Sequence, residues 1–182
     1  MLAPADNPPI LSPQAVGISE LSGQWWVGHT KARCEKAFAW DLIRCGIGYF
    51  LPMIERVRMS GGRKRRGLAT LFPSYVFFCG TEEDRYAAMT TNRLCQTLEV
   101  PDQEGLVAEL AAIEKALEGK AELDPYPFAA VGQPCRVRSG PFRGIEGIVV
   151  RRKTLARLVL QVSILGQGAS LEVDADLLEP ID

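Results

Sequence analysis

The sequence has very little histidine and no paired-cysteine motif, and both shortages exclude chemistry. His29 is the only histidine among 182 residues, and the five cysteines are odd in number with no C-x-x-C spacing. Zinc sites and disulfide frameworks need such ligands in sets, so we expect neither, and favour reduced, buried thiols. A Cys–His nucleophile pair is the one catalytic alternative, but no orienting third group accompanies it. We therefore expect a protein that is not an enzyme and that needs no metal or cofactor.

Long apolar runs are also missing. No stretch approaches the roughly 20 apolar residues that a membrane helix needs. Residues 1–22 are rich in Pro, Ala and Ser and carry no basic leader, so they are expected to form a disordered tail rather than a signal peptide. We expect a monomeric, cytoplasmic protein without membrane contact.

A surplus of positive charge is the third absence. The net charge is −1 and the isoelectric point is about 5.9. A protein that grips nucleic acid unaided usually presents a broad basic field, which this composition does not supply. Any contact with DNA or RNA must therefore be local and assisted.

The first two thirds of the chain alternate between strand-like and helix-like patterns. Gln24–Thr30 and Leu71–Cys79 are predicted strands, the second being the strongest in the chain, and Lys31–Cys45 is a predicted helix. The remaining predictions are a strand at Ile47–Val57, a mobile basic loop at Arg58–Thr70, a helix at Glu83–Thr91, a strand at Leu94–Val100 and a helix at Gly105–Glu118. This alternation indicates an α/β domain with a mixed sheet.

The first predicted helix has two contrasting faces. On a 3.6-residue wheel, one face is apolar and indicates a core contact: Cys34, Phe38, Leu42 and Cys45. The opposite face carries cations around a tryptophan: Arg33, Lys36, Trp40 and Arg44, with Lys31 just before the helix. Such a tryptophan can stack on an unpaired base while the cations hold phosphates, or it can simply pack against the linker or the barrel.

A change of composition marks a second domain. Residues 119–130 carry two prolines in a short polar run and are predicted to be a linker. Beyond them, short strands separated by glycines are predicted: Pro134–Arg138, Ile145–Arg151, Leu158–Leu165, Ala169–Val173 and Leu177–Pro180. A small five-stranded barrel of about SH3 size would close the edges of such strands.

The C-terminal stretch VGQPCRVRSGPFRGIEGIVV resembles the KOW motif. Gly140 and Gly144 supply the backbone angles of a tight turn, Pro141 fixes one of them, and Gly147 lets two strands approach closely. The N-terminal part, through Trp25, Trp26 and LFPSYVFF, is similar to the NGN domain of the NusG family of bacterial transcription factors. Both domains match in the family's order.

The resemblance implies an α+β protein: an N-terminal α/β sandwich NGN domain at residues 23–118, followed by a five-stranded SH3-like KOW β-barrel at residues 131–182. It also implies a factor that binds RNA polymerase and suppresses pausing or termination. The polymerase-binding residues implied are those lining a hydrophobic depression for the clamp helices of the largest subunit: Trp26, Phe72, Pro73 and Tyr75. An alternative is a KOW-type RNA-binding or ribosome-associated protein, against which the LFPSYVFF strand speaks.

Specialised RfaH-like paralogues of the family are similar in FLPMIERVR and GGRKRR. In them the first helix faces the non-template DNA strand, which implies nucleic-acid contacts for Lys31, Arg33, Lys36, Trp40 and Arg44. The basic stretch Arg63, Lys64, Arg65 and Arg66 is expected to contact nucleic acid or an acidic polymerase element, or else to be a solvated loop. The barrel is expected to hold a small-subunit ribosomal protein or the termination factor Rho through Phe142, Ile145, Ile164 and Leu165.

Overall fold

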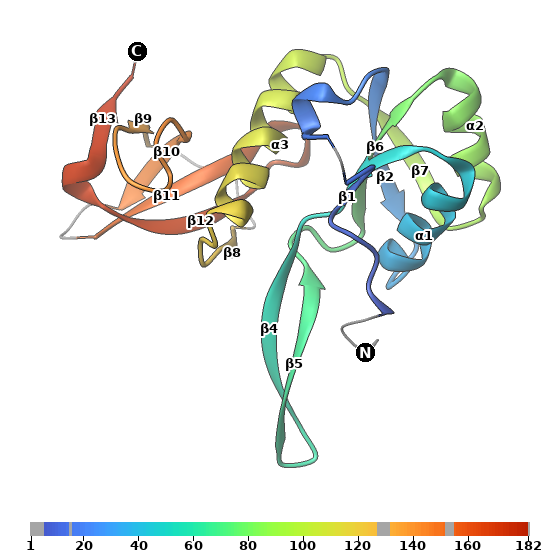
Figure 1. The fold of residues 1–182 in the computed structure, drawn as a ribbon, viewed down its shortest axis with the longest axis horizontal. Coiled ribbons are helices and arrows are strands. Elements are labelled where there is room, and N and C mark those ends of the chain that lie inside the picture. Colours follow the sequence, from blue (N-terminus) through green and yellow to red (C-terminus); the bar gives the residue numbers. More distant parts are fainter. Residues whose placement is uncertain (1–5, 15, 127–131, 152–154, 182) are drawn as a thin grey trace. The chain divides into compact units, whose positions relative to one another are not determined.

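The structure is a computed structural model that describes residues 6–14, 16–126, 132–151 and 155–181 (Figure 1). Contacts divide the chain into two compact units, Met1–Gln103 and Glu104–Asp182, and each unit is described by itself. The division lies at the start of a long helix, α3 (Gln103–Glu118), whereas the predicted domain boundary follows that helix. By its contacts α3 thus belongs almost entirely to the second unit.

The first unit is a five-stranded sheet with two helices and a separate two-stranded ribbon. Its elements are β1 (Leu11–Ser12), a 3-10 turn (Ile18–Glu20), β2 (Gln24–Thr30), α1 (Glu35–Cys45), β3 (Gly48–Phe50), β4 (Met53–Ser60), β5 (Arg63–Thr70), β6 (Tyr75–Gly80), α2 (Glu82–Thr90) and β7 (Leu94–Glu99). The sheet order is β1-β3-β6-β2-β7, and β4 pairs only with β5 among the described residues.

Every pairing that the structure describes in this sheet is antiparallel, so the predicted mixed sheet is wrong here. The reason lies in the two crossovers. The β2–α1–β3 crossover joins two parallel strands, but β6 lies between them, and the β6–α2–β7 crossover is split in the same way by β2. Each parallel pair is separated by an antiparallel neighbour, which is the split β-α-β arrangement.

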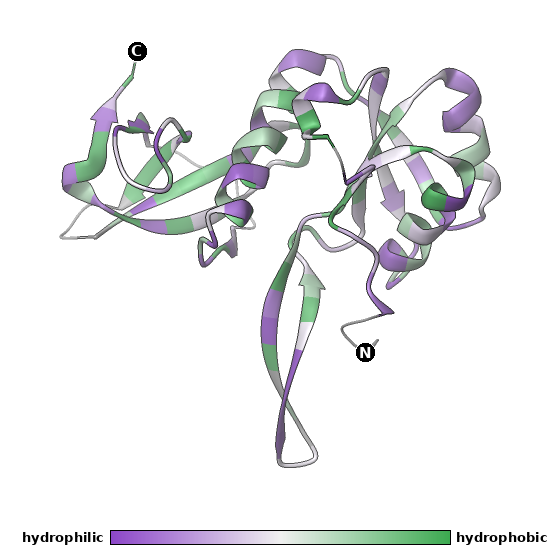
Figure 2. Ribbon diagram, in the orientation of Figure 1, coloured by the Kyte–Doolittle hydropathy of each residue, from purple (hydrophilic) through white to green (hydrophobic). Residues whose placement is uncertain are grey.

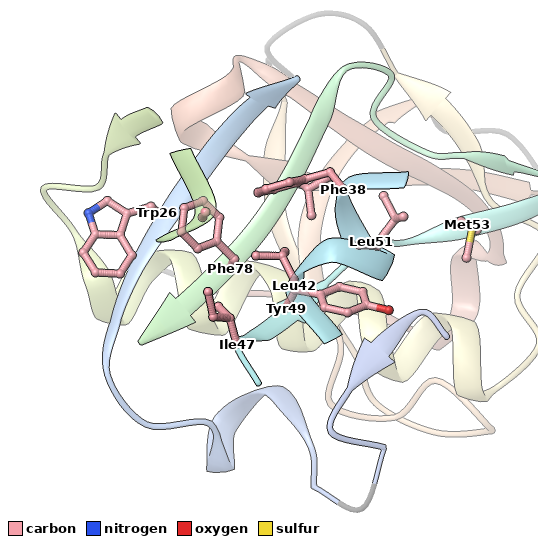
Figure 3. Close-up of a cluster of buried hydrophobic side chains, with 11 residues drawn as sticks. Trp26, Phe38, Leu42, Ile47, Tyr49, Leu51, Met53 and Phe78 are labelled. Atoms are coloured by element: carbon pink, nitrogen blue, oxygen red, sulfur yellow. The ribbon is translucent and has the colours of Figure 1, made fainter. Parts of the chain in front are cut away.

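The core of this unit lies between the sheet and α1. Phe38 and Leu42 of α1 are fully buried against β2 and β6, as the apolar helix face predicts (Figure 3). The ring of Phe78 meets Phe38 edge to face, with centroids 5.9 Å apart, and stacks on Trp26 at 5.7 Å. Such pairs add to the transfer free energy of burying each ring, so this cluster holds the unit together.

The N-terminal residues that are described differ from the predicted disordered tail. β1 pairs with β3, the Leu51 amide donates to the Ile10 carbonyl over 2.7 Å, and the Tyr49 hydroxyl donates to the Pro9 carbonyl over 2.8 Å. Ile18 is fully buried. Apolar side chains at intervals, together with an unpaired edge at β3, are enough to hold this proline-rich segment in place.

The predicted basic loop is instead a ribbon. β4 and β5 pair over eight residues each, from Met53↔Thr70 to Ser60↔Arg63. The turn between them is Gly61-Gly62, and both glycines have positive φ (57° and 73°). Two left-handed residues form the tight turn whose twist suits a hairpin, and Gly-Gly provides it at little steric cost. The cations of the predicted loop are therefore held in strand register.

The second unit combines α3 with a six-stranded antiparallel sheet. Its strands are β8 (Asp124–Tyr126), β9 (Gln133–Val137), β10 (Glu146–Arg151), β11 (Leu155–Val162), β12 (Gln167–Asp174) and β13 (Leu178–Pro180). They lie in the order β13-β9-β10-β11-β12-β8. The described pairings do not join β13 to β8, so closure of the sheet into a barrel stays a prediction. All five predicted strands are present. β8 is additional and lies in the predicted linker, of which residues 127–130 fall outside the described residues.

The glycine pattern of the second unit behaves as the sequence predicts. Gly140 and Gly144 both have φ of 83°, which side chains other than glycine rarely adopt. At Gly147 a Cβ would stand 2.6 Å from the Val159 carbonyl oxygen on the neighbouring strand. The turn and the close strand approach are therefore both confirmed.

Candidate functional site

Helix α1 ends at Gly46, whose left-handed backbone (φ 71°) caps the last turn. Its buried face fixes the orientation of the helix, so the cationic residues predicted to bind nucleic acid must lie away from the core. Lys31, Arg33 and Arg44 are indeed exposed, whereas Lys36 is half-buried and Trp40 is 37% exposed. The predicted set does not form one open face.

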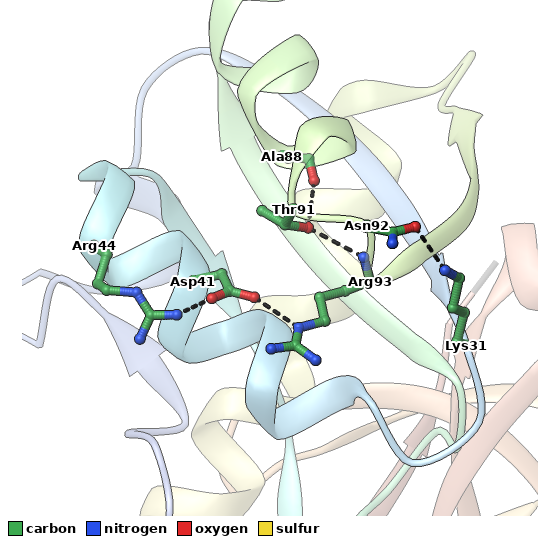
Figure 4. A network of polar contacts seen from close by, with 7 residues as sticks. All are labelled: Lys31, Asp41, Arg44, Ala88, Thr91, Asn92 and Arg93. Carbon is green, nitrogen blue, oxygen red and sulfur yellow. Dashed lines mark hydrogen bonds and ion pairs between the residues drawn. The ribbon is translucent and has the colours of Figure 1, made fainter.

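Lys31 and Arg44 belong to a polar network around Asp41 (Figure 4). The Asp41 carboxylate is almost buried and accepts from Arg44 within the helix and from Arg93 Nε, 2.9 Å away at the start of β7. The neighbouring Asn92 accepts from Lys31 Nζ at 2.7 Å. The hydrogen bond between Arg93 and Asp41 raises the pKa of the Arg93 guanidinium, which is nearly half exposed. The result is a surface of three cations, of which the Asp41 carboxylate holds Arg44 and Arg93 and the Asn92 side chain holds Lys31.

Sequence reasoning missed Arg93, Asn92 and the anchoring role of Asp41. The Asp41–Arg44 pair has a local signal, since residues three apart share a helix face. Arg93 has none, because 52 residues separate it from Asp41 and only the fold brings them together. We add Arg93 to the candidate cationic surface, which we call the α1 cation surface: Lys31, Arg44 and Arg93.

Lys36 and Trp40 contact the N-terminal segment instead. The Lys36 ammonium donates to Asn7 Oδ1 and, over 2.6 Å, to the Leu68 carbonyl, while Trp40 Nε1 donates to the Asp6 carbonyl over 3.3 Å. Burial lowers the pKa of Lys36, and the nearby Glu35 carboxylate opposes that shift. In this structure the two side chains hold residues 6 and 7, so the contact of Trp40 is with the N-terminal segment and not with the linker or the barrel that the packing alternative named.

The residues implied to bind the polymerase divide into core and surface. Trp26 (1% exposed) and Phe72 (2% exposed) are buried, and Phe72 packs edge to face on Phe77 at 6.0 Å. Phe72, which the resemblance implies lines the depression, is therefore turned into the core. Pro73 is exposed and Tyr75 half-buried. Their shared strand region remains a candidate surface, with Trp26 and Phe72 supporting it from the core.

The turn that carries Pro73 is fixed by hydrogen bonds on both sides. Ser74 has positive φ (70°), its amide donates to Glu35 Oε1 over 2.7 Å, and its carbonyl accepts from the Thr30 amide over 2.8 Å. Beyond the turn, the Tyr75 ring stacks on His29, which stands opposite it on β2, with centroids 5.2 Å apart. The only histidine is thus part of an aromatic surface, which we call the His29–Tyr75 surface, together with Pro73.

The third predicted cationic group lies at the end of the β4–β5 ribbon. Arg63, Lys64, Arg65 and Arg66 are all exposed, and they occupy successive positions of β5. Successive strand residues point to opposite faces, so these four cations are divided between two faces rather than gathered in one cluster.

In the second unit, the residues implied to hold a ribosomal protein or Rho lie next to α3. Ile145 is buried, and Phe142, Ile164 and Leu165 are half-buried. Phe142 packs so closely on the end of α3 that a Cβ at Gly119 would stand 2.8 Å from its ring. The Ser163 amide donates to Glu109 of α3 over 3.0 Å, and a cleft of about 710 Å³ between α3 and β10–β11 is lined by Ile145. Within this unit, α3 therefore covers part of the implied partner surface.

The described residues contain no group of three or more His, Cys, Asp or Glu side chains placed to hold a metal ion. None of the helices in the described ranges is long and apolar enough to cross a membrane. Two of the five cysteines, Cys79 and Cys135, are buried, whereas Cys45 and Cys95 are exposed, so the prediction of buried thiols holds only in part.

Comparison with known proteins gives a family match for part of the chain. Residues 23–112 match the sequence profile of the family described as "Transcription termination factor nusG". Among solved structures, the chain is similar to the one entitled "Domain interaction in Thermotoga maritima NusG", at 19% identity and a TM-score of 0.47, covering 91% of this chain and 100% of that one. No curated protein matches the sequence.

Proposed function

We propose that this chain, whose residues 23–112 match the NusG family of transcription factors, is an elongation factor that binds RNA polymerase with its first unit and suppresses pausing or termination. The family acts in transcription elongation and termination, binds RNA polymerase and is non-enzymatic, so this protein is not an enzyme. It would act by shifting the equilibrium between two polymerase conformations. The size of that shift is limited by the difference in its affinity for the two conformations. Its further likeness to RfaH-like paralogues makes antitermination the direction that we propose.

The observation that carries the proposal is the His29–Tyr75 surface. It places an exposed proline and two stacked, partly exposed rings on a rigid sheet, and the Glu35–Ser74 and Thr30–Ser74 hydrogen bonds fix the turn beside them. An apolar helix laid on such a surface would bury it, which is a recurrent mode of recognition. The clamp helices of the polymerase largest subunit are the partner that we propose for it.

The α1 cation surface supports a second contact of the same unit. Lys31, Arg44 and Arg93 carry three positive charges at positions held by Asp41 and Asn92, and the single Asp41 carboxylate offsets only one of these charges. We propose that it holds the phosphates of the exposed non-template strand. The stacking role of Trp40 requires residues 6 and 7 to move away from it, because Asp6 now accepts its indole N–H.

The test of polymerase binding is co-purification with purified RNA polymerase. Pro73→Ala/Tyr75→Ala should reduce binding by about 2 kcal/mol or more, because large side chains at the centre of an interface contribute most of its free energy. Phe72 is left intact, since truncating a buried ring would lower the stability of the unit. Tyr86→Ala is the matched control: Tyr86 is 70% exposed on α2 and should be dispensable. Full binding by the double variant, with the fold retained in circular dichroism, would refute the assignment.

For the second unit we propose that the sheet binds a small-subunit ribosomal protein or Rho through Phe142, Ile145, Ile164 and Leu165. The glycine turn confirmed at Gly140 and Gly144 supports a KOW-like unit at this position. Because Ile145 is buried and α3 lies over its cleft, Ile164 and Leu165 are the more accessible pair. Pull-down of each partner by Ile164→Ser/Leu165→Ser protein, against the unchanged chain, tests this surface.

A further inference from the structure

The β4–β5 ribbon concentrates positive charge in an acidic protein. Residues 53–70 contain five arginines, one lysine and a single carboxylate, Glu55, in a chain whose net charge is −1. The ribbon is a two-stranded sheet with no third strand among the described residues, and Figure 1 shows it leaving the body of its unit as one hairpin. A concentration of like charge on a projecting element costs self-repulsion unless a polyanion lies near.

Strand register sorts these charges by face. Residues that pair directly across two strands share a face, and the faces alternate along each strand. One face carries the pairs Arg56↔Gly67, Arg58↔Arg65 and Ser60↔Arg63. It therefore carries Arg56, Arg63 and Arg65 and no carboxylate among the side chains that the structure describes, and Gly67 permits close approach. We call it the arginine face.

The opposite face is different in composition. It carries the pairs Glu55↔Leu68, Val57↔Arg66 and Met59↔Lys64. Its two cations are offset by one carboxylate, and its aliphatic side chains are well exposed, at 56% for Val57 and 65% for Met59. Figure 2 shows green and purple residues alternating along β4, which reflects the alternation of the two faces along the strand, and hydrophilic residues in the part of β5 near the turn. The charge asymmetry between the faces is what a loop could not provide.

The dimensions of the ribbon restrict the polyanion. Paired strands lie about 4.8 Å apart, and the major groove of B-DNA, about 12 Å wide, admits a two-stranded ribbon, whereas the minor groove is about half as wide. A ribbon rises about 3.3 Å per residue, so the six residues from Glu55 to Ser60 reach some 17 Å. Arginine suits this environment because its planar guanidinium binds phosphate or guanine through two parallel hydrogen bonds.

We propose that the β4–β5 ribbon binds double-stranded DNA, with its arginine face turned into the major groove. The base of the ribbon is fixed to the unit: Met53 and Ile54 are buried, and the Leu71 amide donates to the Pro52 carbonyl over 2.8 Å. A rigid base and a pre-formed hairpin reduce the entropy cost of binding. The ribbon thus contacts a different form of DNA from the single strand proposed for the α1 cation surface. The inference deepens the proposed function and rests on it, because a factor bound to transcribing RNA polymerase lies close to duplex DNA.

The test measures binding of the full chain to a labelled 20-base-pair DNA duplex, without polymerase, over a range of salt concentrations. Arg63→Gln/Arg65→Gln removes two charges from the arginine face, and Lys64→Gln/Arg66→Gln removes two charges from the same strand but the opposite face. The first variant should weaken duplex binding by about tenfold at low salt and flatten the salt slope by about 2, one for each phosphate that an arginine no longer neutralises. The second should change both quantities much less.

Equal losses in the two variants would show that the ribbon acts only as a diffuse charge, and unchanged binding in both would show a solvated hairpin; either result overturns the proposal. Tighter binding of the single strand or of a duplex RNA also overturns it. Loss of polymerase co-purification by Arg63→Gln/Arg65→Gln with duplex affinity retained would assign the ribbon to an acidic protein element instead. Failure of the proposed function can be distinguished from these results, because Pro73→Ala/Tyr75→Ala is tested by co-purification with RNA polymerase and not by binding to DNA.

Discussion

In the first unit, the β6 strand and the β4–β5 ribbon have the same strand geometry but different roles. β6 lies in the middle of the sheet with Phe77 and Phe78 fully buried, whereas the ribbon pairs with nothing else described and exposes Val57 and Met59. Backbone pairing alone is marginal for a two-stranded hairpin in water. The difference teaches that stability resides in the sheet and charge resides in the ribbon, so the two can be altered independently.

The largest effect should come from breaking the sheet. Phe78→Ala removes a buried ring that contacts both Trp26 and Phe38, and it should lower the free energy of unfolding by about 3–5 kcal/mol. Met59→Ala, on the exposed ribbon, should change it by no more than about 0.5 kcal/mol. Urea denaturation followed by circular dichroism measures both. A similar loss for the two variants would contradict the division of roles.

A smaller and local effect should come from the ribbon turn. Gly62→Ala places a Cβ at a φ of 73°, which costs about 1 kcal/mol, and hydrogen exchange should show faster exchange of the β4 and β5 amides. The amides of β6 should be unaffected, because they exchange through opening of the whole unit. Gly67→Ala is the matched control, since Gly67 lies in the same ribbon outside the positive-φ positions. Loss of protection in β6 would mean that ribbon and sheet open together.

The last effect concerns pH. Burial, assisted by the Asp84 carboxylate, raises the pKa of the Cys79 thiol in β6 from its ordinary value of 9.0 to about 11. A group with a raised native pKa stabilises the fold below its unfolded pKa, so stability should fall as pH rises from 9.0 towards about 11, by at most about 1.4 kcal/mol per pH unit. Cys79→Ala should remove this part of the decline in urea midpoints, whereas the same substitution at the exposed Cys45 should not. Identical pH profiles for all three proteins would refute the assignment.

The elements that periodicity marks strongly were predictable. The apolar face of α1, the β6 strand and the glycine-rich C-terminal strands all follow patterns of buried side chains, which a sequence displays directly. The first half of β4 lies within the predicted strand Ile47–Val57, but the rest of β4 and all of β5 were predicted to be a loop. They were missed because most of their residues are polar, and a strand without a buried face has no regular alternation of apolar residues. The Gly-Gly turn of the ribbon was the signal available, and the flanking cations hid it.

The candidate site was predictable only in part, for a similar reason. Lys31 and Arg44 were found from helix geometry, but Arg93 and Asn92 join them through tertiary contact alone. Phe72 was expected to line the polymerase-binding depression because of the family resemblance, yet it turns inward to Phe77. Which of two adjacent aromatics faces the core depends on the backbone of the Ser74 turn, whose positive φ the sequence does not announce.

The N-terminal segment also affects where the chain can be truncated. The family match begins at residue 23, but β1 covers the outer edge of β3 and Ile18 is fully buried. A fragment starting at residue 23 would bare a row of unpaired amides and carbonyls on β3, and such an edge is a template for pairing with other molecules. We therefore expect the segment to prevent self-association through the β3 edge. The solubility of an isolated first unit should then depend on residues that lie outside the family match.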